Sequence, residues 1–191
     1  MIEPPFLIQA YRQGYFPMAM EDGRIGWFSP DPRAVLPLDS MRVSRRLARV
    51  VRSARFEVVI DRDFEGVMRA CASARDEGTW ISDEIIESYL ALRRLGLAHS
   101  VECWREGRLV GGLYGVHLGG AFFGESMFHH ETDASKVSLA ALVTHMRARQ
   151  MTLLDIQWVT PHLAKFGAVE IPRSQYLSHL AHAIVQPCTF G

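Results

Sequence analysis

The sequence predicts an α+β protein in which a mixed β-sheet with flanking helices is preceded by a small N-terminal domain. Three observations lead to this fold class. Apolar runs on both sides of a Gly-Gly pair indicate a hairpin at residues 109–125, segments with helical spacing lie before and after it, and the first 54 residues are rich in proline and arginine. A chain of 191 residues suits one domain of moderate size with a small appendage, so we divide it into residues 1–54 and 55–191.

Composition narrows the class of protein. Apolar residues make up 48% of the chain, and the formal net charge is zero, so a polyanionic partner has to be held by a local patch. Cys71, Cys103 and Cys188 are far apart and form no CxxC pair, which argues against a disulfide framework or a zinc site and for a reducing compartment. No apolar run approaches a membrane span and the first residues carry no signal pattern, so we expect a cytoplasmic protein without a membrane partner.

The N-terminal part is expected to hold a short helix, an irregular segment and a basic helix. Residues 5–13 form an apolar helix that ends at Gly14, and the prolines that follow predict irregular structure up to about residue 39. Ser44 caps a helix that extends to about Ser53. The stretch between residues 40 and 56 has no acidic residue, and it is either a solvated face or a phosphate-binding face. Its arginines are Arg42, Arg45, Arg46, Arg49, Arg52 and Arg55.

From Phe56 onward, strands and helices follow one another regularly. Ser82 with two acidic residues after it favours a helix start, and Asp133 is the expected N-cap of the helix after the hairpin. Thr160 caps a further helix with proline at its first position. Helices are expected at 63–75, 83–95, 133–149, 161–166 and 174–185, and strands at 56–60, 99–105, 109–118, 121–125, 153–159 and 168–171.

The hairpin is unusually rich in glycine. Gly119 and Gly120 suit the tight turn, and Gly124-Glu125-Ser126 is expected to end the second strand. Glycine within a strand costs conformational entropy, which indicates that something approaches the backbone closely. For any one glycine a bulge or the twist of the sheet explains this; for the whole run we expect a ligand that lies along the sheet.

The element order β-α-α-β-β-β-α-β-α-β over residues 55–191 is that of the acyl-CoA N-acyltransferase (GNAT) fold. A fold alone does not define an activity. Acetyltransferases of this fold carry an R/Q-x-x-G-x-G/A loop after the fourth strand, whereas this chain has SMFHHETDASK there. We therefore do not expect it to bind acetyl-CoA.

Several uncommon short sequence motifs are spread in order over nearly the whole chain. The chain resembles the leucyl/phenylalanyl-tRNA–protein transferase family in AYRQGYFPM (10–18), WFSPDPRAVLPLD (27–39), VSRRL (43–47), GTWI (78–81), AHSVE (98–102), LVGGLYGV (109–116), GESMF (124–128), DASK (133–136), DIQ (155–157) and FGAVEIPR (166–173).

This resemblance implies an enzyme without metal or coenzyme that moves Leu or Phe, with Met as a further candidate, from aminoacyl-tRNA (Leu-tRNA or Phe-tRNA). The acceptor is the N-terminal α-amine of proteins that begin with Arg or Lys, which marks them for N-degron degradation. A monomer is expected. The alternatives are a GNAT-fold acyltransferase with another activated acyl donor, and a non-enzymatic RNA-binding module that uses the arginine helix alone.

The resemblance also implies site residues. Asp155 and Gln157 are the family's D-x-Q motif, with Glu125 beside them, and Trp80 is the tryptophan that stacks on the terminal adenosine. Met18 stands where some members have a second stacking tryptophan. The implied pocket for the aminoacyl side chain consists of Leu113, Phe122, Gly124, Ser126 and Leu142, and the implied tRNA contacts are Arg42, Arg45, Arg46 and Arg49.

The implied reaction requires positioning of the amine against the ester carbonyl more than it requires a strong base. An aminoacyl ester is already activated, and a protein α-amine with a pKa of about 7.7–8.0 is partly neutral at cellular pH. Residues i and i+2 of a strand project from the same face, so Asp155 can orient the Gln157 amide, whose carbonyl oxygen then accepts a proton from the amine. Lys136 lies in the first turn of a helix, where we expect it to pair with an acid such as Glu125 or Glu131.

Overall fold

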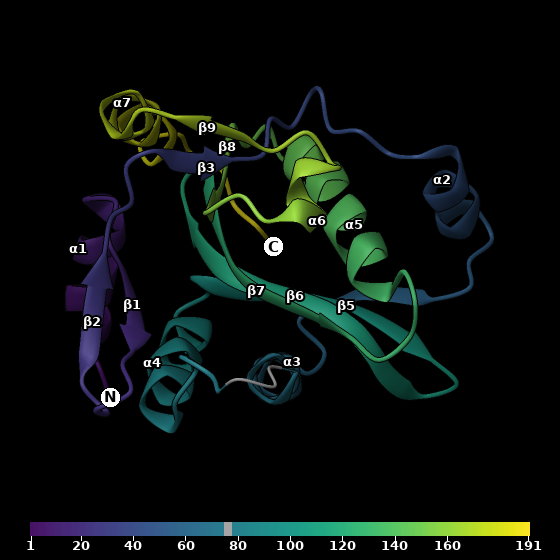
Figure 1. The fold of residues 1–191 in the computed structure, drawn as a ribbon, viewed down its shortest axis with the longest axis horizontal. Helices are drawn as coiled ribbons and strands as arrows, with labels where there is room; N and C mark the ends of the chain where they lie inside the picture. The colour runs from purple at the N-terminus through teal and green to yellow at the C-terminus, as the bar shows by residue number, and fades with distance from the viewer. Residues whose placement is uncertain (75–77) are drawn as a thin grey trace.

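The computed structural model describes residues 1–74 and 78–191 and has a seven-stranded mixed sheet with helices on both faces (Figure 1). Its elements are α1 (Pro4–Arg12), β1 (Phe16–Ala19), β2 (Ile25–Phe28), β3 (Arg33–Val35), α2 (Arg45–Arg52), β4 (Glu57–Ile60), α3 (Phe64–Ser73), α4 (Asp83–Arg94), β5 (Ala98–Arg105), β6 (Arg108–Leu118), β7 (Ala121–His129), α5 (Ala134–Ala148), β8 (Leu153–Gln157), α6 (Pro161–Ala164), β9 (Val169–Ile171) and α7 (Arg173–Ala183). The predicted α+β class, with a mixed sheet and flanking helices, is confirmed. The predicted end of the first helix of the second part, at residue 75, lies outside the described residues.

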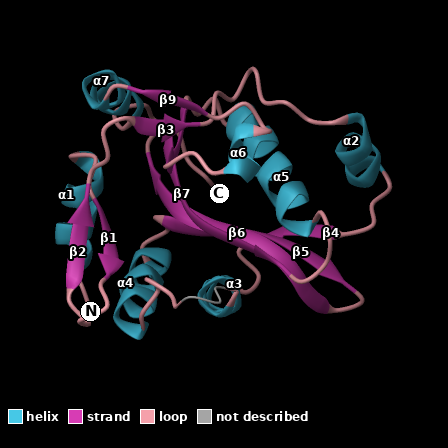
Figure 2. Cartoon of the chain, in the orientation of Figure 1, coloured by secondary structure: helices cyan, strands magenta, loops and turns pink. Residues whose placement is uncertain are grey.

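The order of strands in the large sheet is β4-β5-β6-β7-β8-β3-β9 (Figure 2). β7 and β8 are parallel, and the other neighbours are antiparallel. The parallel pair covers only three positions and ends at Phe123 and Asp155. Beyond them β7 continues to His129 while β8 ends at Gln157, so the two strands separate within the sheet.

Two apolar cores lie on opposite faces of this sheet. α3 and α4 cover one face, and α5 covers the other, with α2 packed against α5 (Figure 1). Tyr11, Tyr89 and Phe123 belong to the first core, whereas Leu113 and Leu142 belong to the second. None of the helices in the described ranges is long and apolar enough to cross a membrane.

The hairpin differs from its prediction at its second strand. β7 continues to His129 instead of ending at Gly124-Glu125-Ser126, because residues 126–129 pair with residues 111–114 of β6. Packing within the protein, rather than the expected ligand, explains the glycines of β6. A Cβ atom on Gly111 would lie 2.5 Å from the Cβ of Ala134, so this glycine lets the N-terminus of α5 pack on the sheet.

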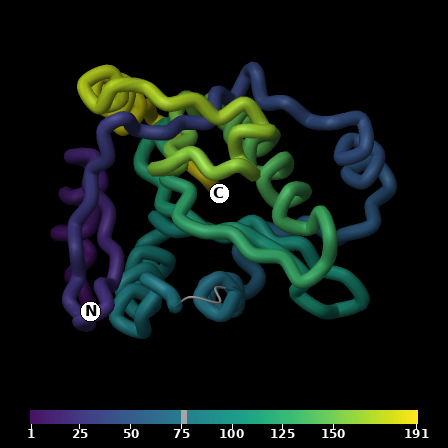
Figure 3. The backbone as a smooth tube through the Cα atoms, viewed as in Figure 1, coloured from purple at the N-terminus to yellow at the C-terminus, as the bar shows by residue number. Residues whose placement is uncertain are grey.

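The segment predicted to be irregular contains three strands. β1 and β2 form a small hairpin, and β3 enters the large sheet between β8 and β9. Sequence patterns missed β3 because it is three residues long and stands next to prolines. Figure 3 shows this N-terminal segment (purple to blue) beside the C-terminal segment (yellow). The division at residue 54 stays a prediction, although residues on both sides of it build one sheet.

Candidate active site

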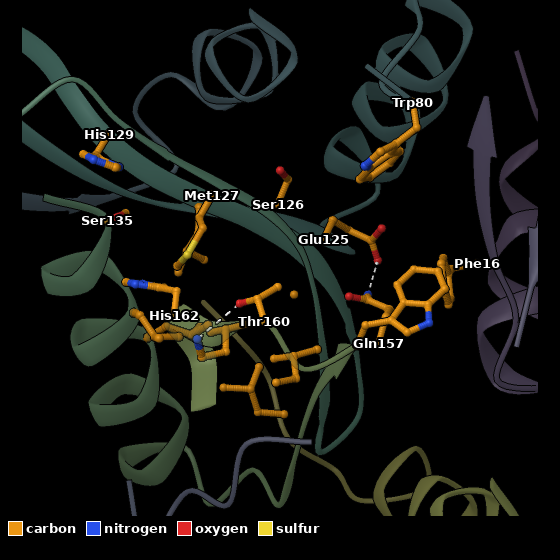
Figure 4. A pocket seen from close by; sticks show the side chains of 18 of the residues that line it. Phe16, Trp80, Glu125, Ser126, Met127, His129, Ser135, Gln157, Thr160 and His162 are labelled. Carbon is orange, nitrogen blue, oxygen red and sulfur yellow. Dashed lines mark hydrogen bonds between the residues drawn. The ribbon is translucent and has the colours of Figure 1, made fainter. Parts of the chain in front are cut away.

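A pocket opens where β7 and β8 separate. Its volume is about 610 Å³, and residues of β7, β8, α5 and the N-terminal hairpin line it (Figure 4). Eight of the predicted site residues line it together with residues that the sequence did not indicate. The predicted ones are Trp80, Met18, Leu113, Gly124, Ser126 and Leu142, joined by Glu125 and Gln157, and the others include Phe16, Met127, Ser135, Leu139, Leu154, Trp158 and His162.

Gln157 faces the pocket because of an unusual backbone conformation. Its φ of +58° is left-handed, which breaks the alternation of β8. The side-chain amide donates a hydrogen bond from Nε2 to Oε1 of Glu125 at 3.3 Å (Figure 4). Within the described residues, the side-chain carbonyl oxygen of Gln157, Oε1, accepts no hydrogen bond. It is the group that can receive an N–H from a bound amine.

Asp155 does not line the pocket, contrary to the expectation that it shares a face with Gln157. Its carboxylate accepts two hydrogen bonds from Arg33, at 2.9 Å from Nε and 2.6 Å from Nη2, and one from the Tyr176 hydroxyl at 2.7 Å. All three side chains are buried. Asp155 reaches Gln157 only through the backbone, where Oδ1 accepts the Gln157 N–H at 3.0 Å. It therefore holds the left-handed residue in place and leaves the Gln157 amide free to turn toward Glu125.

Arg33 ties three parts of the chain to this carboxylate. Besides Asp155, it donates from Nη1 to the carbonyl of Gly14 at 3.0 Å, and its guanidinium lies over the rings of Phe16 and Tyr176. Burial acts to lower the pKa of Arg33, but the adjacent Asp155 carboxylate outweighs it and the pKa is raised. A buried charge is tolerated only when it is paired and hydrogen-bonded, and this pair meets both conditions.

Glu125 is held in a ring of three oxygen-bearing groups. Oε1 lies 2.7 Å from the Tyr11 hydroxyl, Oε2 lies 3.1 Å from the Tyr89 hydroxyl, and the two hydroxyls also contact each other. Two phenols supply two protons for these three contacts, so all three become hydrogen bonds only when the carboxyl carries a proton as well. Burial raises the pKa of Glu125 from 4.5 to about 8, although the hydrogen bonds from the two tyrosines act in the opposite direction. Burial therefore favours the protonated form of Glu125 near neutral pH.

The end of the pocket near Glu125 and Gln157 is aromatic. Trp80 precedes α4, and its carbonyl accepts the N–H of Ala19 at 3.1 Å, which fixes it beside β1. Phe16 and Trp158 meet edge to face at 5.1 Å between ring centroids. Flat rings at this end suit a planar ligand, since aromatic side chains stack on nucleobases.

The middle of the pocket is apolar. Leu113 and Leu142 line it as predicted, together with Leu139 and Leu154, which the sequence did not indicate. Phe122 does not line it. Its ring is fully buried and stacks on Phe190 at 5.1 Å between centroids, so it packs within the core.

The basic helix lies outside the pocket. α2 lies against α5 (Figure 1), Leu47 is its buried residue, and its arginines are exposed. Arg46 is engaged within the protein, because its Nη2 lies 2.6 Å from the Asp133 carboxylate. Asp133 is the N-cap residue of α5, as predicted, but its φ of +74° is left-handed and its side chain makes no capping hydrogen bond. Arg42, Arg45 and Arg49 are exposed.

An apolar pocket between separated strands of a mixed sheet, with a buried carboxyl and an amide beside it, has the make-up of an enzyme site that holds an apolar group next to polar groups. The family comparison identifies the class of enzyme: the chain belongs to the leucyl/phenylalanyl-tRNA–protein transferase family, whose members are aminoacyltransferases. The model of the Leucyl/phenylalanyl-tRNA protein transferase family matches residues 35–181, and the model of its N-terminal domain matches residues 1–31.

Relatives with this family name are similar along their whole length. The chain is 56% identical to the leucyl/phenylalanyl-tRNA–protein transferase of Rubrobacter xylanophilus over 184 residues, which is 96% of this chain and 95% of the relative. It is 53% identical to that of Gloeobacter violaceus over 190 residues, 99% and 97% of the two chains. Among solved structures, L-PGS from Bacillus licheniformis is 14% identical with a TM-score of 0.41, and the match covers 85% of this chain and 55% of that one.

Proposed function

We propose that this protein transfers Leu or Phe from aminoacyl-tRNA to the N-terminal α-amine of proteins that begin with Arg or Lys. The observation that carries the proposal is the pocket itself, in which an apolar section adjoins Glu125, Gln157 and an aromatic end. Family membership and whole-length relatives of this name support it. The products would enter N-degron degradation, and the protein would act as a cytoplasmic monomer with a GNAT-like fold.

Three parts of the donor occupy three places in the pocket. The terminal adenine stacks on Trp80, with Met18 on the other side in place of an aromatic ring. The Leu or Phe side chain enters the apolar section at Leu113 and Leu142. This arrangement brings the ester carbonyl toward Glu125 and Gln157, which lie where the aromatic end adjoins the apolar section.

The reaction follows from the two polar groups at this point. The neutral α-amine attacks the ester carbonyl carbon, so a C–N bond forms and the C–O bond to the ribose breaks. The free carbonyl oxygen of Gln157 accepts one N–H hydrogen bond and orients the amine. Protonated Glu125 donates its proton to the departing ribose oxygen and is reprotonated by the proton that the amine loses, which leaves the charge of the site unchanged.

The remaining residues act from a distance. Asp155 positions Gln157 through its backbone N–H, and Tyr11 and Tyr89 position Glu125. The arginines of α2, above all Arg45 and Arg49, are proposed to contact the phosphates of the tRNA, since they are exposed and no acid intervenes in the sequence.

A transfer assay tests this function. Wild-type protein is incubated with Leu-tRNA and an Arg-starting peptide, with acetyl-CoA as the control donor and the same peptide with an acetylated N-terminus as the control acceptor. We expect leucyl peptide only from the first combination. Transfer from acetyl-CoA would favour a different acyltransferase, and binding of tRNA without any transfer would favour an RNA-binding module.

A further inference from the structure

Trp158 stands at the rim of the pocket, directly after Gln157. Its side chain is 43% exposed and also lines the pocket, so part of the indole faces the cavity and part faces solvent. Gln157 is the centre of a three-residue turn, in which the Trp158 N–H donates to the Ile156 carbonyl at 2.7 Å. The turn therefore holds Trp158 next to the amide that is proposed to orient the acceptor amine.

The first side chain of the acceptor has to lie close to this turn. The amine and the side chain of an N-terminal residue leave the same Cα atom, so a group that recognises the side chain must stand within one side-chain length of Gln157. Phe16 and Gln157 line the same end of the pocket (Figure 4). Since Trp80 is assigned to the donor adenine, Phe16 and Trp158 are the phenylalanine and tryptophan rings of the described lining that the donor does not use.

No free carboxylate of the described residues lines the pocket to pair with a cationic side chain. Glu125 is the sole acid among the described residues that line it. Glu125 is buried, and its two oxygens contact the hydroxyls of Tyr11 and Tyr89. Burial also raises the pKa of Glu125 to about 8, which disfavours its charged form. An arginine or lysine side chain that enters beside Gln157 therefore meets aromatic rings in place of a counter-ion.

The ring of Trp158 is available to a cation. Aromatic faces attract ammonium and guanidinium groups, and the indole does so most strongly. Phe16 and Phe28 hold this indole from the sides, with ring centroids at 5.1 and 6.4 Å and interplanar angles of 87° and 65°. The Arg33 guanidinium already lies 4.9 Å from the Phe16 centroid, whereas no arginine of the described ranges lies over Trp158.

We propose that Trp158 binds the positively charged side chain of the acceptor's first residue through a cation–π contact. This rests on the proposed function. A ring face accepts a planar guanidinium and a compact ammonium alike, whereas a carboxylate favours the guanidinium through a bidentate contact. Trp158 is thus a specificity-determining residue that selects arginine and lysine as one class of acceptor and rejects neutral residues of the same shape.

Four acceptor peptides that differ at their first residue test this proposal. They begin with arginine, with its neutral isostere citrulline, with lysine, and with norleucine, which lacks the ammonium group. The donor is Leu-tRNA in each case. For wild-type protein we expect kcat/KM to be about fivefold to thirtyfold higher for each charged peptide than for its neutral counterpart, the range for a cation over a partly desolvated indole.

Variants assign this preference to Trp158. Trp158→Leu remains apolar but has no ring face, and it should reduce both ratios to about twofold or less, chiefly by raising KM for the charged peptides. Trp158→Phe should give intermediate ratios and carries the test if Trp158→Leu unfolds, as checked by thermal unfolding. Trp27→Leu is the matched control, since Trp27 lies against Phe6 and does not line the pocket, and it should keep the wild-type ratios.

The outcomes separate this proposal from the proposed function. Wild-type ratios in Trp158→Leu would overturn the cation site. A loss of the ratios in Glu125→Gln, with the ratios of Trp158→Leu intact, would assign the cation to Glu125 instead. If no peptide receives leucine from wild-type protein, the proposed function fails. The site is then tested with L-argininamide, which should shift the indole N–H resonance of Trp158 saturably, and with L-citrullinamide, which should not; equal shifts, or none, overturn it.

Discussion

The Arg33 guanidinium and the Asp155 carboxylate form a fully buried pair joined by two hydrogen bonds of 2.9 and 2.6 Å. The two residues are 122 positions apart in the sequence, on the adjacent strands β3 and β8. Because Asp155 also accepts the N–H of Gln157, the pair connects the N-terminal part of the chain to the residue that is proposed to orient the amine.

Removal of one partner of this pair should destabilise the fold strongly. Arg33→Met leaves a buried carboxylate without its counter-charge, and we expect a loss of about 3–5 kcal/mol in the free energy of unfolding. The double variant Arg33→Met with Asp155→Leu should lose much less than the sum of the two single changes. Urea unfolding of the four proteins measures this, and additive losses would show that the two side chains are not coupled.

Gln157 should matter for turnover more than for donor binding. Gln157→Ala removes the oxygen that is proposed to orient the amine, and we expect turnover to fall about tenfold to a hundredfold, at or below the low end for general acid–base groups. Asp155→Asn should have a smaller or similar effect, and the double variant should lose little more than Gln157→Ala alone, since Asp155 acts through Gln157. Single-turnover transfer at a temperature where all variants are folded is the measurement. Independent, multiplicative losses would contradict this coupling.

Glu125 should make stability fall as the pH rises. The pKa of Glu125 is about 8 in the folded protein and 4.5 without the fold, so the folded state binds more protons between these values. The stability that Glu125 contributes is therefore complete below pH 4.5 and is lost as the pH rises through 8, by about 2–4 kcal/mol.

Glu125→Gln should abolish most of this pH dependence. We expect the variant to be more stable relative to wild type at pH 8.5 than at pH 5, as measured by urea unfolding at both values. Glu87→Gln, on the exposed side of α4, is the matched control and should leave the profile unchanged. Parallel profiles for wild type and Glu125→Gln would show that Glu125 is ionised in the folded protein.

Trp80 should supply most of the stacking on the donor base. Trp80→Phe should keep most of the affinity for an aminoacyl-adenosine, while Trp80→Ala should lose about 1–3 kcal/mol, the range for one base on one aromatic ring. Met18, which also lines the pocket, offers no ring to compensate. A Trp80→Ala protein that binds the donor normally but melts at a lower temperature would assign Trp80 to the core.

The arginines of α2 should set the salt dependence of tRNA binding. The double variant Arg45→Ala with Arg49→Ala should bind tRNA more weakly and reduce the slope against log[salt] by about one to two units. Binding of an aminoacyl-adenosine should not change. Arg12→Ala with Arg94→Ala, two exposed arginines on α1 and α4, is the control. An equal loss of slope in the control would mean that net charge is responsible.

The sequence indicated the elements with local signatures and missed those made by distant contacts. Helical spacing and caps placed α2, α4 and α5 to within a few residues, and Gly119-Gly120 marked the hairpin. β3 has no periodicity of its own, because three residues become a strand only through pairing with β8 and β9.

The candidate site divides in the same way. The sequence motifs shared with the family contain Glu125, Gln157 and Trp80, and these three residues line the same pocket. Tyr89 lies in none of these motifs, and Tyr11, although AYRQGYFPM contains it, was assigned no role, since the two lie on separate helices and meet only in the first core. The left-handed conformation of Gln157 could not be read from its type, and it is why the rule that residues i and i+2 share a face was wrong for Asp155.

The insertion of β3 between β8 and β9 also has a consequence for synthesis on the ribosome. Residues 33–35 leave the exit tunnel long before residues 153–171, the strands that flank them, have been translated. Until then Arg33 has no counter-charge and has to stay in water, and the backbone of β3 has no neighbour to pair with. The pocket therefore assembles only when nearly the whole chain has been made, and a nascent or prematurely terminated chain contains no partly active form of the enzyme.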